Sequence, residues 1–472
     1  MELNEQQLQR RASLEAIREL GIDPFPAEPF DVNVTAADIK QNYADDKLNY
    51  KSISIAGRLM RRRIMGKASF AELQDDTGKI QLYVNRDEIC PDEDKALYNR
   101  VFKKLLDIGD IIGVTGYVFT TQVGEISIHV TSLKVLCKSL NPLPMPKEVD
   151  GQVFDAFTDP ENRYRMRYVD LIVNPQVRDI FTKRSQTIGA MRRFLDGMGY
   201  MEVETPILQP IPGGAAARPF ITHHNALDIP LYLRIANELY LKRLIVGGYK
   251  GVYEFAKDFR NEGMDRTHNP EFTQMELYVA YKDYNWMMDT TEEMLRAISE
   301  KVCGETKIKY GEQEIDFGQP FQRMAIFEAI EKYTGKNLHG QDEEQLRATC
   351  KELDLHVEKT WGAGKMIDEI FGEFVEEHLI QPTFIKDYPV SMSPLTKKHR
   401  EDPTLTERFE LIINGKEIAN CYSELNDPID QRERFEEQVK LLERGDDEAM
   451  FIDEDFLRSL EYGMPPTAGI GI

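Results

Sequence analysis

Apolar and polar residues alternate along short stretches between residues 50 and 140. In three of these stretches every second position is apolar, namely Ile53 and Ile55, then Ile80, Leu82 and Val84, then Ile126 and Ile128. A period of two is typical of a strand that buries one face. The turn residues in Asp76–Lys79 predict a hairpin between two of the strands. The pattern therefore predicts five short strands, interrupted by a helix at about 91–106.

Five short strands with one interrupting helix suit an OB-fold barrel, whose open face commonly takes single-stranded nucleic acid. On the strand pattern alone, a barrel used only for packing or dimerisation remains an alternative. The net charge of −22 argues against nucleic-acid binding. A local basic cluster argues for it, and its members are Arg58, Arg61, Arg62, Arg63 and Lys67. Because local placement outweighs the average charge, we expect this cluster to follow phosphates.

Outside the barrel, the periodicity changes to helical spacing and to alternating helices and strands. Leu14, Ile17 and Leu20 predict an N-terminal helix that is either exposed or docked. A proline-rich connector begins at Asn141 and marks a domain boundary. We expect an N-terminal extension (1–49), an OB-fold domain (50–140), a linker (141–177) and an α+β domain (178–472) with a helical insertion at about 320–380.

Composition limits the class of protein. With 472 residues, 41% apolar and 30% charged, the chain can bury two cores and has no apolar run suited to a membrane span. Its polar, acidic N-terminus fits neither a signal peptide nor a transit peptide. The five cysteines are scattered, without a C-x-x-C pair, which argues against disulfides and zinc and favours a reducing cytoplasm.

The segment Phe259–Thr273 places an arginine and an aromatic residue on the two arms of a predicted hairpin. Arg260 and Glu262 open the segment, and Phe272 closes it. A guanidinium grips a phosphate or carboxylate through two hydrogen bonds, and the aromatic ring offers a plate for a base. The segment could therefore hold a nucleotide by both its phosphate and its base.

Carboxylates crowd a second predicted hairpin. Asn414 and Gly415 form its turn, so Glu410 and Glu417 could sit side by side on neighbouring strands. Paired carboxylates together with phosphate oxygens are how Mg²⁺ is usually held. Further polar residues follow on one side of the strand: Asn420, Tyr422 and Glu424. A solvated charged face would explain Glu410 and Glu417 singly, but it explains this alternation poorly.

In chain order, these segments resemble the motifs of the class II aminoacyl-tRNA synthetases. Lys183–Gly199 and Met201–Pro206 resemble motif 1, a long helix and a strand that pack across a two-fold axis. Phe259–Thr273 resembles motif 2, and its sequence from His268 onward is most similar to that of the bacterial-type lysyl-tRNA synthetases. The resemblance implies a catalytic domain with an antiparallel sheet flanked by helices, and a homodimer through motif 1.

The resemblance also implies a role for each site residue. ATP would be bound by Arg260, Glu262, His268, Asn269, Phe272, Glu410 and Glu417, the last two through Mg²⁺. Lysine would be bound by Gly214, Glu238, Arg260, Glu276, Tyr278, Asn420, Tyr422 and Glu424. Arg260 would be catalytic, because it would bridge the α-phosphate and the amino-acid carboxylate. The anticodon of tRNA-Lys would be read by Phe70, Gln81 and Glu125.

Charge in the amino-acid pocket favours lysine without the resemblance. A partly desolvated ε-ammonium needs opposite charge and hydrogen-bond acceptors. Glu238, Glu424 and the Tyr278 hydroxyl would supply them, and Glu276 would share a strand face with Tyr278. An aspartate-selective site would need cationic groups at these positions. An aspartate- or asparagine-type synthetase is therefore the less favoured alternative.

The last residues depart from the family pattern. Gly463–Ile472 resembles the opening of motif 3, which in the family continues into an ATP-clamping arginine and a helix. We therefore expect a sequence truncated in motif 3, and poor lysine activation by a chain that ends at Ile472. A non-catalytic tRNA-binding relative remains an alternative, although the intact motif 2 favours truncation.

Overall fold

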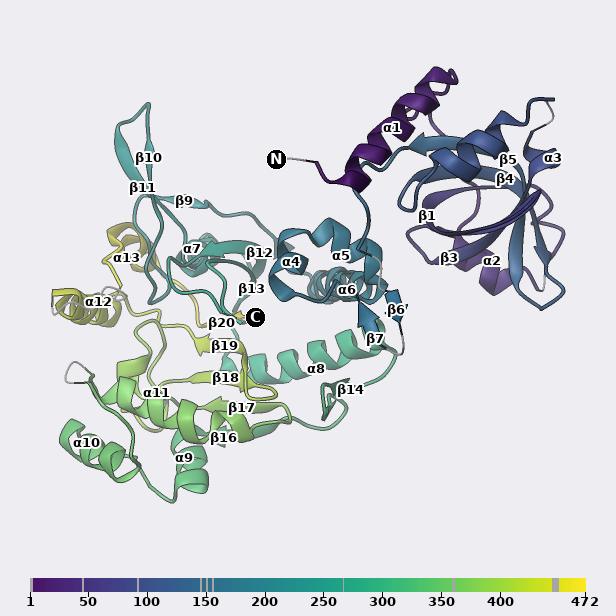
Figure 1. Ribbon diagram of the computed structural model, residues 1–472. Coiled ribbons are helices and arrows are strands. Elements are labelled where there is room, and N and C mark those ends of the chain that lie inside the picture. Colours follow the sequence, from purple (N-terminus) through teal and green to yellow (C-terminus); the bar gives the residue numbers. More distant parts are fainter. Residues whose placement is uncertain are drawn as a thin grey trace. The chain divides into compact units, whose positions relative to one another are not determined.

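The computed structural model describes residues 3–44, 46–90, 93–144, 147–149, 152–154, 157–265, 267–358, 361–443 and 450–472. They divide into two units, Met1–Ile180 and Phe181–Ile472 (Figure 1). The first unit has one continuous apolar core, and the second has three apolar clusters around a large sheet.

A closed five-stranded barrel forms the body of the first unit, in the order β1-β2-β3-β5-β4. Its strands are β1 (Ile53–Met65), β2 (Ala68–Gln74), β3 (Lys79–Asn85), β4 (Ile111–Thr120) and β5 (Ile126–Cys137). The alternating apolar residues fill the barrel, where Ile55, Leu82 and Ile128 are fully buried. The predicted OB-fold is confirmed. Its helical connection is shorter than expected and consists of α3 (Arg86–Ile89) and the π-helical η1 (Leu97–Leu105), while residues 91 and 92 lie outside the described residues.

Two helices precede the barrel strands, α1 (Glu5–Glu19) and α2 (Ala36–Asn42). Leu14 and Ile17 of α1 are buried, and the Arg10 guanidinium donates to the carbonyl oxygen of Ile108 at 2.8 Å. The N-terminal helix is therefore docked rather than exposed. The elements after the barrel are β6 (Lys147–Val149), β7 (Gln152–Phe154), α4 (Pro160–Arg165) and α5 (Arg167–Val173).

An eight-stranded sheet organises the second unit, in the order β16-β17-β18-β19-β20-β13-β12-β8. Its strands are β8 (Met201–Glu202), β12 (Gly251–Phe259), β13 (Glu271–Ala280), β16 (Gln322–Ala325), β17 (Thr383–Lys386), β18 (Arg408–Ile412), β19 (Glu417–Ser423) and β20 (Thr467–Gly471). The expected antiparallel sheet needs correction at both edges, because β16 pairs with β17 and β8 with β12 in parallel. The parallel β16–β17 pair needs a crossover. The connecting elements are α9 (Ile326–Thr334), α10 (Glu343–Glu352), α11 (Ala363–Phe374) and η2 (Glu376–His378).

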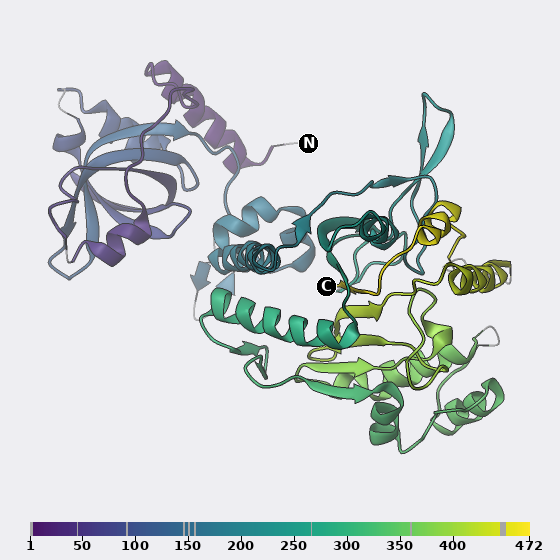
Figure 2. The ribbon, with the colours of Figure 1, turned by 180° about the vertical axis from the view of Figure 1, so that it is seen from behind.

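Helices cover both faces of this sheet. α6 (Pro175–Gly197) and α8 (Tyr284–Cys303) pack their apolar side chains on one face, and Figure 2 shows α8 running along the sheet. α7 (Glu238–Val246) and α13 (Glu454–Glu461) pack on the opposite face. The remaining elements are β9 (Leu208–Gln209), β10 (Ile221–His224), β11 (Ile229–Leu233), β14 (Lys307–Tyr310), β15 (Gln313–Asp316), η3 (Val390–Met392) and α12 (Pro428–Glu443). Within the described ranges, no helix combines the length and apolar character needed to cross a membrane.

Candidate active site

A cavity of about 600 Å³ opens over the centre of the large sheet, where β19, β20 and β13 lie side by side. Successive side chains of a strand point to opposite faces. The apolar set packs toward α8 and includes Met275, Leu277, Val279, Ala419 and Cys421. The polar set lines the cavity and includes Gln274, Glu276, Tyr278, Asn420 and Tyr422. Each strand thus contributes core on one face and site on the other.

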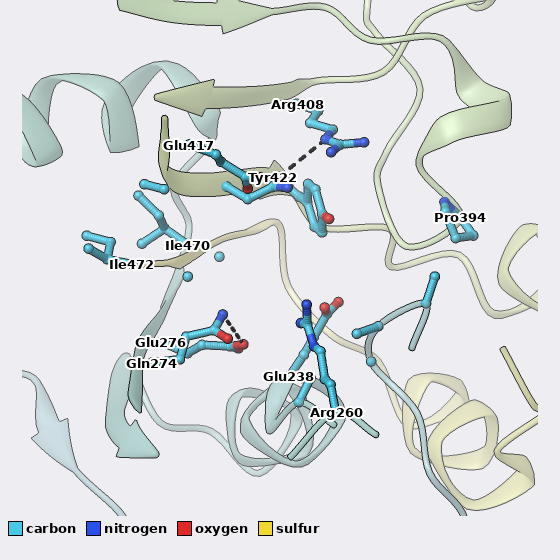
Figure 3. A pocket seen from close by; sticks show the side chains of 18 of the residues that line it. Glu238, Arg260, Gln274, Glu276, Pro394, Arg408, Glu417, Tyr422, Ile470 and Ile472 are labelled. Carbon is cyan, nitrogen blue, oxygen red and sulfur yellow. Dashed lines mark hydrogen bonds between the residues drawn. The ribbon is translucent and has the colours of Figure 1, made fainter. Parts of the chain in front are cut away.

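Two groups of side chains face each other across the cavity. Figure 3 shows Arg408, Glu417 and Tyr422 on one side, and Glu238, Arg260 and Glu276 on the other. The predicted shared face of Glu276 and Tyr278 is confirmed, because the Tyr278 hydroxyl donates to Glu276 Oε2 at 2.8 Å. Burial, followed by the charge of nearby Glu238, raises the pKa of Glu276 well above its usual range. A cationic ligand would therefore favour the ionised form of this carboxyl group.

Arg260 and Phe272 meet at the end of the β12–β13 hairpin. Asp258 pairs with Phe272 in the antiparallel ladder, and the backbone N–H of Arg260 donates to Pro270 O at 2.9 Å. The guanidinium carbon of Arg260 lies 5.1 Å from the centroid of the Phe272 ring. Both residues line the cavity. The predicted pairing of an arginine and an aromatic ring across a hairpin is confirmed.

Lys242 lies between the two glutamates expected to receive an ammonium group. Glu238 begins α7 and lines the cavity, whereas Glu424 is buried directly after β19. Lys242 Nζ is 2.5 Å from Glu238 Oε1 and forms an ion pair with Glu424 Oε2. Among the described residues, Glu424 Oε1 has no hydrogen-bond donor. The acidic pair therefore carries an internal counter-ion and keeps one free acceptor.

Two glycines leave room beside these carboxylates. Gly214 has a φ of +91°, and a Cβ there would lie 3.3 Å from the Glu238 Cβ. A Cβ on Gly469 would lie 2.2 Å from Glu424 Oε1 and 2.3 Å from Tyr278 Cε1. A side chain at position 469 would therefore displace the groups that form the acidic end of the cavity.

Glu410 and Glu417 lie near each other, but they are not cross-strand partners. Glu410 pairs with Asn420, and Glu417 lies beyond a register shift, so the expected side-by-side placement is corrected. Glu417 lines the cavity, while Glu410 accepts from the Tyr388 hydroxyl at 2.8 Å and forms an ion pair with Arg408. The side chain of Glu417 is exposed at the cavity, yet the surrounding protein atoms and the Glu410 charge raise its carboxyl pKa to about 7.

These two carboxylates fit a divalent cation in the chemistry of their donors. Carboxylate oxygens are the ligands that Mg²⁺ prefers, and a cation would offset both causes of the raised Glu417 pKa, which are burial and then the Glu410 charge. Within the described part of the chain, no three His, Cys, Asp or Glu side chains are grouped as a complete metal site. Phosphate oxygens would therefore have to complete the coordination.

Comparison with known proteins gives the family. Residues 159–472 match the family model of class II tRNA synthetases (D, K and N), and residues 53–136 match that of the OB-fold nucleic acid binding domain. A lysine–tRNA ligase of Porphyromonas gingivalis is 64% identical over all of this chain and 82% of its own length. Lysine–tRNA ligases of Christiangramia forsetii and Azobacteroides pseudotrichonymphae are 63% and 60% identical, over all of this chain and 82% and 94% of their own lengths. The chain belongs to the class II lysine–tRNA ligase family.

Within this lysine–tRNA ligase site, three residues assigned to ATP lie away from the cavity wall. Glu262, His268 and Asn269 lie on the exposed loop between β12 and β13. His268 Nδ1 lies 2.8 Å from Asp265 Oδ2, and Glu262 accepts from the backbone N–H of Arg218 at 3.3 Å. Their contacts with ATP therefore stay predictions.

Three residues in or beside the lysine–tRNA ligase site were not predicted from the sequence: Lys242, Gln274 and Arg408. In the sequence, Lys242 lies one helical turn after Glu238, which is the spacing of an ordinary ion pair within a helix. Gln274 precedes Glu276 by two positions and donates to it at 3.0 Å. Arg408 donates to Asn420 Oδ1 at 3.2 Å. In the sequence, it lies two positions before Glu410. Strand spacing could have indicated Gln274 and Arg408.

A buried ionic network lies behind Arg260 in this ligase fold. Arg234 donates to Glu254 Oε1 at 2.8 Å and forms an ion pair with Asp258 at 3.1 Å. Asn237 donates to Glu254 Oε2 at 2.8 Å. Burial raises the pKa of Asp258 to about 6, although Arg234 and Arg260 oppose this rise. The network joins β12 to the segment that leads into α7, so it fixes the two elements that carry Arg260 and Glu238.

On the barrel, Phe70 lies outside the apolar core. Phe70 on β2 stands opposite Tyr83 on β3, with ring centroids 5.4 Å apart, and Gln81 shares that outer face. Gln81 donates to Ser127 Oγ at 3.2 Å, and the Ser127 hydroxyl donates to Glu125 O at 3.3 Å. Phe70, Gln81 and Glu125 therefore lie on neighbouring parts of one barrel surface, and their role as anticodon readers stays a prediction.

The basic cluster of the barrel divides into two kinds of side chain. Arg58 and Arg62 donate to backbone carbonyl oxygens of the barrel unit itself, and burial lowers the pKa of both. Arg61, Arg63 and Lys67 are exposed. Only part of the predicted phosphate-following cluster thus faces solvent, which corrects the expectation for Arg58 and Arg62.

Proposed function

We propose that this chain activates L-lysine with ATP and transfers the lysine to the 3′-terminal ribose of tRNA-Lys. The observation that carries the proposal is the polarity of the cavity, with Arg260 beside Phe272 at one part and the buried carboxylate of Glu238, joined through Lys242 to Glu424, at another. A cation beside a ring suits a nucleotide, and buried carboxylates suit an ammonium group. Because these reactions use ATP and tRNA, we place the protein in the cytoplasm.

In the activation step, Arg260 is the catalytic residue. Its guanidinium would contact both the α-phosphate and the lysine carboxylate, which reduces their repulsion and aligns them. A carboxylate oxygen then attacks the α-phosphorus, the bond to the β-phosphate breaks, and pyrophosphate leaves. Phe272, which lies beside Arg260, would stack on the adenine. In the second step the ribose hydroxyl attacks the anhydride carbonyl and AMP leaves.

Glu410 and Glu417 would hold Mg²⁺ in this proposal, and Glu417 reaches the cavity directly. When bound, the ion would neutralise phosphate charge. Its presence would also favour the ionised form of Glu417, whose carboxyl has a pKa raised to about 7.

The cavity charge distinguishes lysine from aspartate, one of the two alternative substrates. A second carboxylate on the substrate would meet Glu238, Glu276 and Glu424, and like charges without a counter-ion are costly in a buried site. Three cations stand nearby: Arg260 is assigned to the α-phosphate and the α-carboxylate, Lys242 binds Glu238 and Glu424, and Arg408 binds Glu410. The pocket therefore selects a cationic side chain.

The proposal assigns tRNA binding to the barrel and dimerisation to motif 1. Phe70 offers a stacking surface, and Gln81 offers hydrogen bonds to a splayed anticodon base. Met201 of β8 in motif 1 is 46% exposed, and Phe181 of α6, two residues before motif 1, is 45% exposed, which suits burial by a second copy. Sedimentation at micromolar concentration should therefore give twice the monomer mass, and a monomer would contradict this part.

Aminoacylation tests the proposed function. The full-length protein with ATP, Mg²⁺ and radiolabelled lysine should charge a tRNA-Lys transcript and leave a tRNA-Asp transcript uncharged. Labelled aspartate or asparagine should give no product with either transcript. Charging with aspartate or asparagine would favour the alternative, an aspartate- or asparagine-type synthetase. Failure with all three amino acids would reject both functions.

A further inference from the structure

Lys242 is a lysine side chain buried at the place where the protein is proposed to receive lysine. Its side chain has no exposed surface, although a lysine is rarely buried without a specific partner. Its ammonium touches Glu238 at the start of its own helix and Glu424 beyond β19, so it connects two separate elements. The Phe456 ring of α13 lies 5.9 Å from the same ammonium.

The carboxylates at this end of the cavity outnumber the Lys242 ammonium. Glu238, Glu276 and Glu424 are all buried, and Glu424 Oε1 has no donor among the described residues. Three carboxylates at such close range could not all stay ionised in a dry site without a cation. One fixed ammonium leaves an excess of negative charge, which a ligand with two ammonium groups can balance.

We propose that Lys242 is a positioning residue for substrate selection, which favours the ionised forms of Glu238 and Glu424 and fixes both side chains in place before lysine enters. This inference rests on the proposed function. Lys242 itself does not line the cavity, so it acts through the two glutamates rather than on the substrate. Without its charge, one glutamate would take up a proton, and the incoming lysine would have to displace that proton in order to bind.

Titratable groups on α7, on β13 and on or directly after β19 contribute to this balance, while α13 contributes the Phe456 ring. They are Glu238 on α7, Glu276 and Tyr278 on β13, Tyr422 on β19, and Glu424 after β19. Burial raises the pKa of Glu424, and the Lys242 charge opposes that rise. Burial would lower the pKa of Lys242, but the two glutamates raise it, so Lys242 itself stays charged. Removing its charge therefore moves the glutamate pKa values further upward.

The test compares Lys242→Met and Lys242→Gln with the wild type in lysine-dependent ATP–pyrophosphate exchange, from about pH 6 to about pH 9. Gln keeps a donor for the buried carboxylates and removes only the charge, so it carries the test if the Met variant does not fold. We expect both variants to raise the KM for lysine about tenfold or more at neutral pH, with an unchanged KM for ATP. The ratio of variant to wild-type KM should fall as pH rises, because the glutamates of the variants ionise at higher pH.

The titration of the substrate's own amino group cancels in that ratio. Lys250→Gln, at an exposed lysine, is the matched control and should leave both KM values unchanged. A KM ratio that is constant with pH, or a Gln variant that behaves as the wild type, would overturn the inference. Exchange that is absent in the full-length wild-type protein would instead reject the proposed function.

Discussion

At the scale of single residues, the acidic end of the cavity depends on how each carboxylate is partnered. Glu424 is fully buried and shares Lys242 with Glu238, while its second oxygen stays free for a ligand. Glu276 is satisfied by Tyr278 and Gln274. The free oxygen of Glu424 lies beside Gly469, which lines the cavity, so we expect it to accept a hydrogen bond from a substrate ammonium.

Glu424→Gln should raise the KM for lysine and weaken discrimination against norleucine, which lacks the ε-ammonium. Loss of a charge-assisted hydrogen bond in a buried site costs about 1.5–3 kcal/mol. Pyrophosphate exchange with each amino acid measures the effect, and Glu461→Gln, at an exposed residue of α13, is the control. Unchanged lysine activation in Glu424→Gln would show that the pocket has been assigned to the wrong residues.

Gly469→Ala tests the space beside the same carboxylate. The new Cβ would lie 2.2 Å from Glu424 Oε1, so either the carboxylate or β20 must move. Overpacking of this kind costs about 1–3 kcal/mol, and we expect it mainly in the KM for lysine. Gly372→Ala on α11 is the matched control, because nothing lies within 4 Å of a Cβ there. An equal loss of lysine and ATP affinity would contradict a local effect.

The polar side of the site could be predicted from strand spacing, but the role of Lys242 could not. Glu276 and Tyr278 are two positions apart on one strand, which places them on one face in any sheet. Lys242 and Glu238 are four positions apart on a helix, and such pairs are usually exposed. Only the packing of α7 against β13 and α13 turns this pair inward, and that packing is not encoded in local spacing.

At the scale of elements, buried ion pairs hold the β12–β13 hairpin against the segment before α7. Arg234 bridges Glu254 and Asp258, both of which are buried. Asp258 is the weakest member, since its carboxyl oxygens make no conventional hydrogen bond among the described residues. Burial of these charges lowers the stability of the fold, but the network fixes the position of Arg260.

Asp258→Asn should stabilise the catalytic unit above about pH 6. The pKa of Asp258 is raised to about 6, so the folded state holds a proton that the unfolded state releases at lower pH. The stabilising contribution of the neutral form is present at low pH and is lost as pH rises through about 6. Above about pH 6, the neutral and isosteric Asn side chain should therefore restore up to about 3 kcal/mol of the free energy of unfolding. Thermal melts at pH 4 and pH 8 measure this, and an equal change at both pH values would contradict it.

Some elements could be predicted and others could not, for reasons of length and register. The barrel strands and the Asn414–Gly415 turn carry clear local signals, and the turn has positive φ at both residues. β8 and β16 are too short to show a period, so the parallel edges of the sheet were missed. The register shift between β18 and β19 separates Glu410 from Glu417, and turn chemistry alone does not reveal it.

At the scale of the whole molecule, we expect the barrel unit to recognise tRNA and the second unit to carry out catalysis. The barrel has its own core, and its outer face presents Phe70 and Gln81. The resemblance to the synthetase family indicated these residues, but it did not indicate the aromatic neighbours Tyr83 and His129, whose ring centroids lie 4.9 Å apart. Strands distant in the sequence bring those rings together, so only the closed barrel reveals them.

Phe70→Ala should weaken aminoacylation of tRNA by about 1–3 kcal/mol, the cost of losing one stacked base. Lysine-dependent pyrophosphate exchange without tRNA should hardly change, because the cavity lies in the other unit. Leu48→Ala, at a residue that is 72% exposed in the same unit, is the control. Equal damage to both reactions would mean that Phe70 supports folding rather than tRNA binding.

We propose that an acidic cavity, whose negative charge is partly offset by the Lys242 ammonium, selects lysine for activation. ATP–pyrophosphate exchange by the full-length protein, measured separately with each of the standard amino acids, tests it most directly. Lysine alone should support rapid exchange, and Glu424→Gln should remove most of that preference. Exchange with aspartate or asparagine equal to that with lysine would contradict the claim.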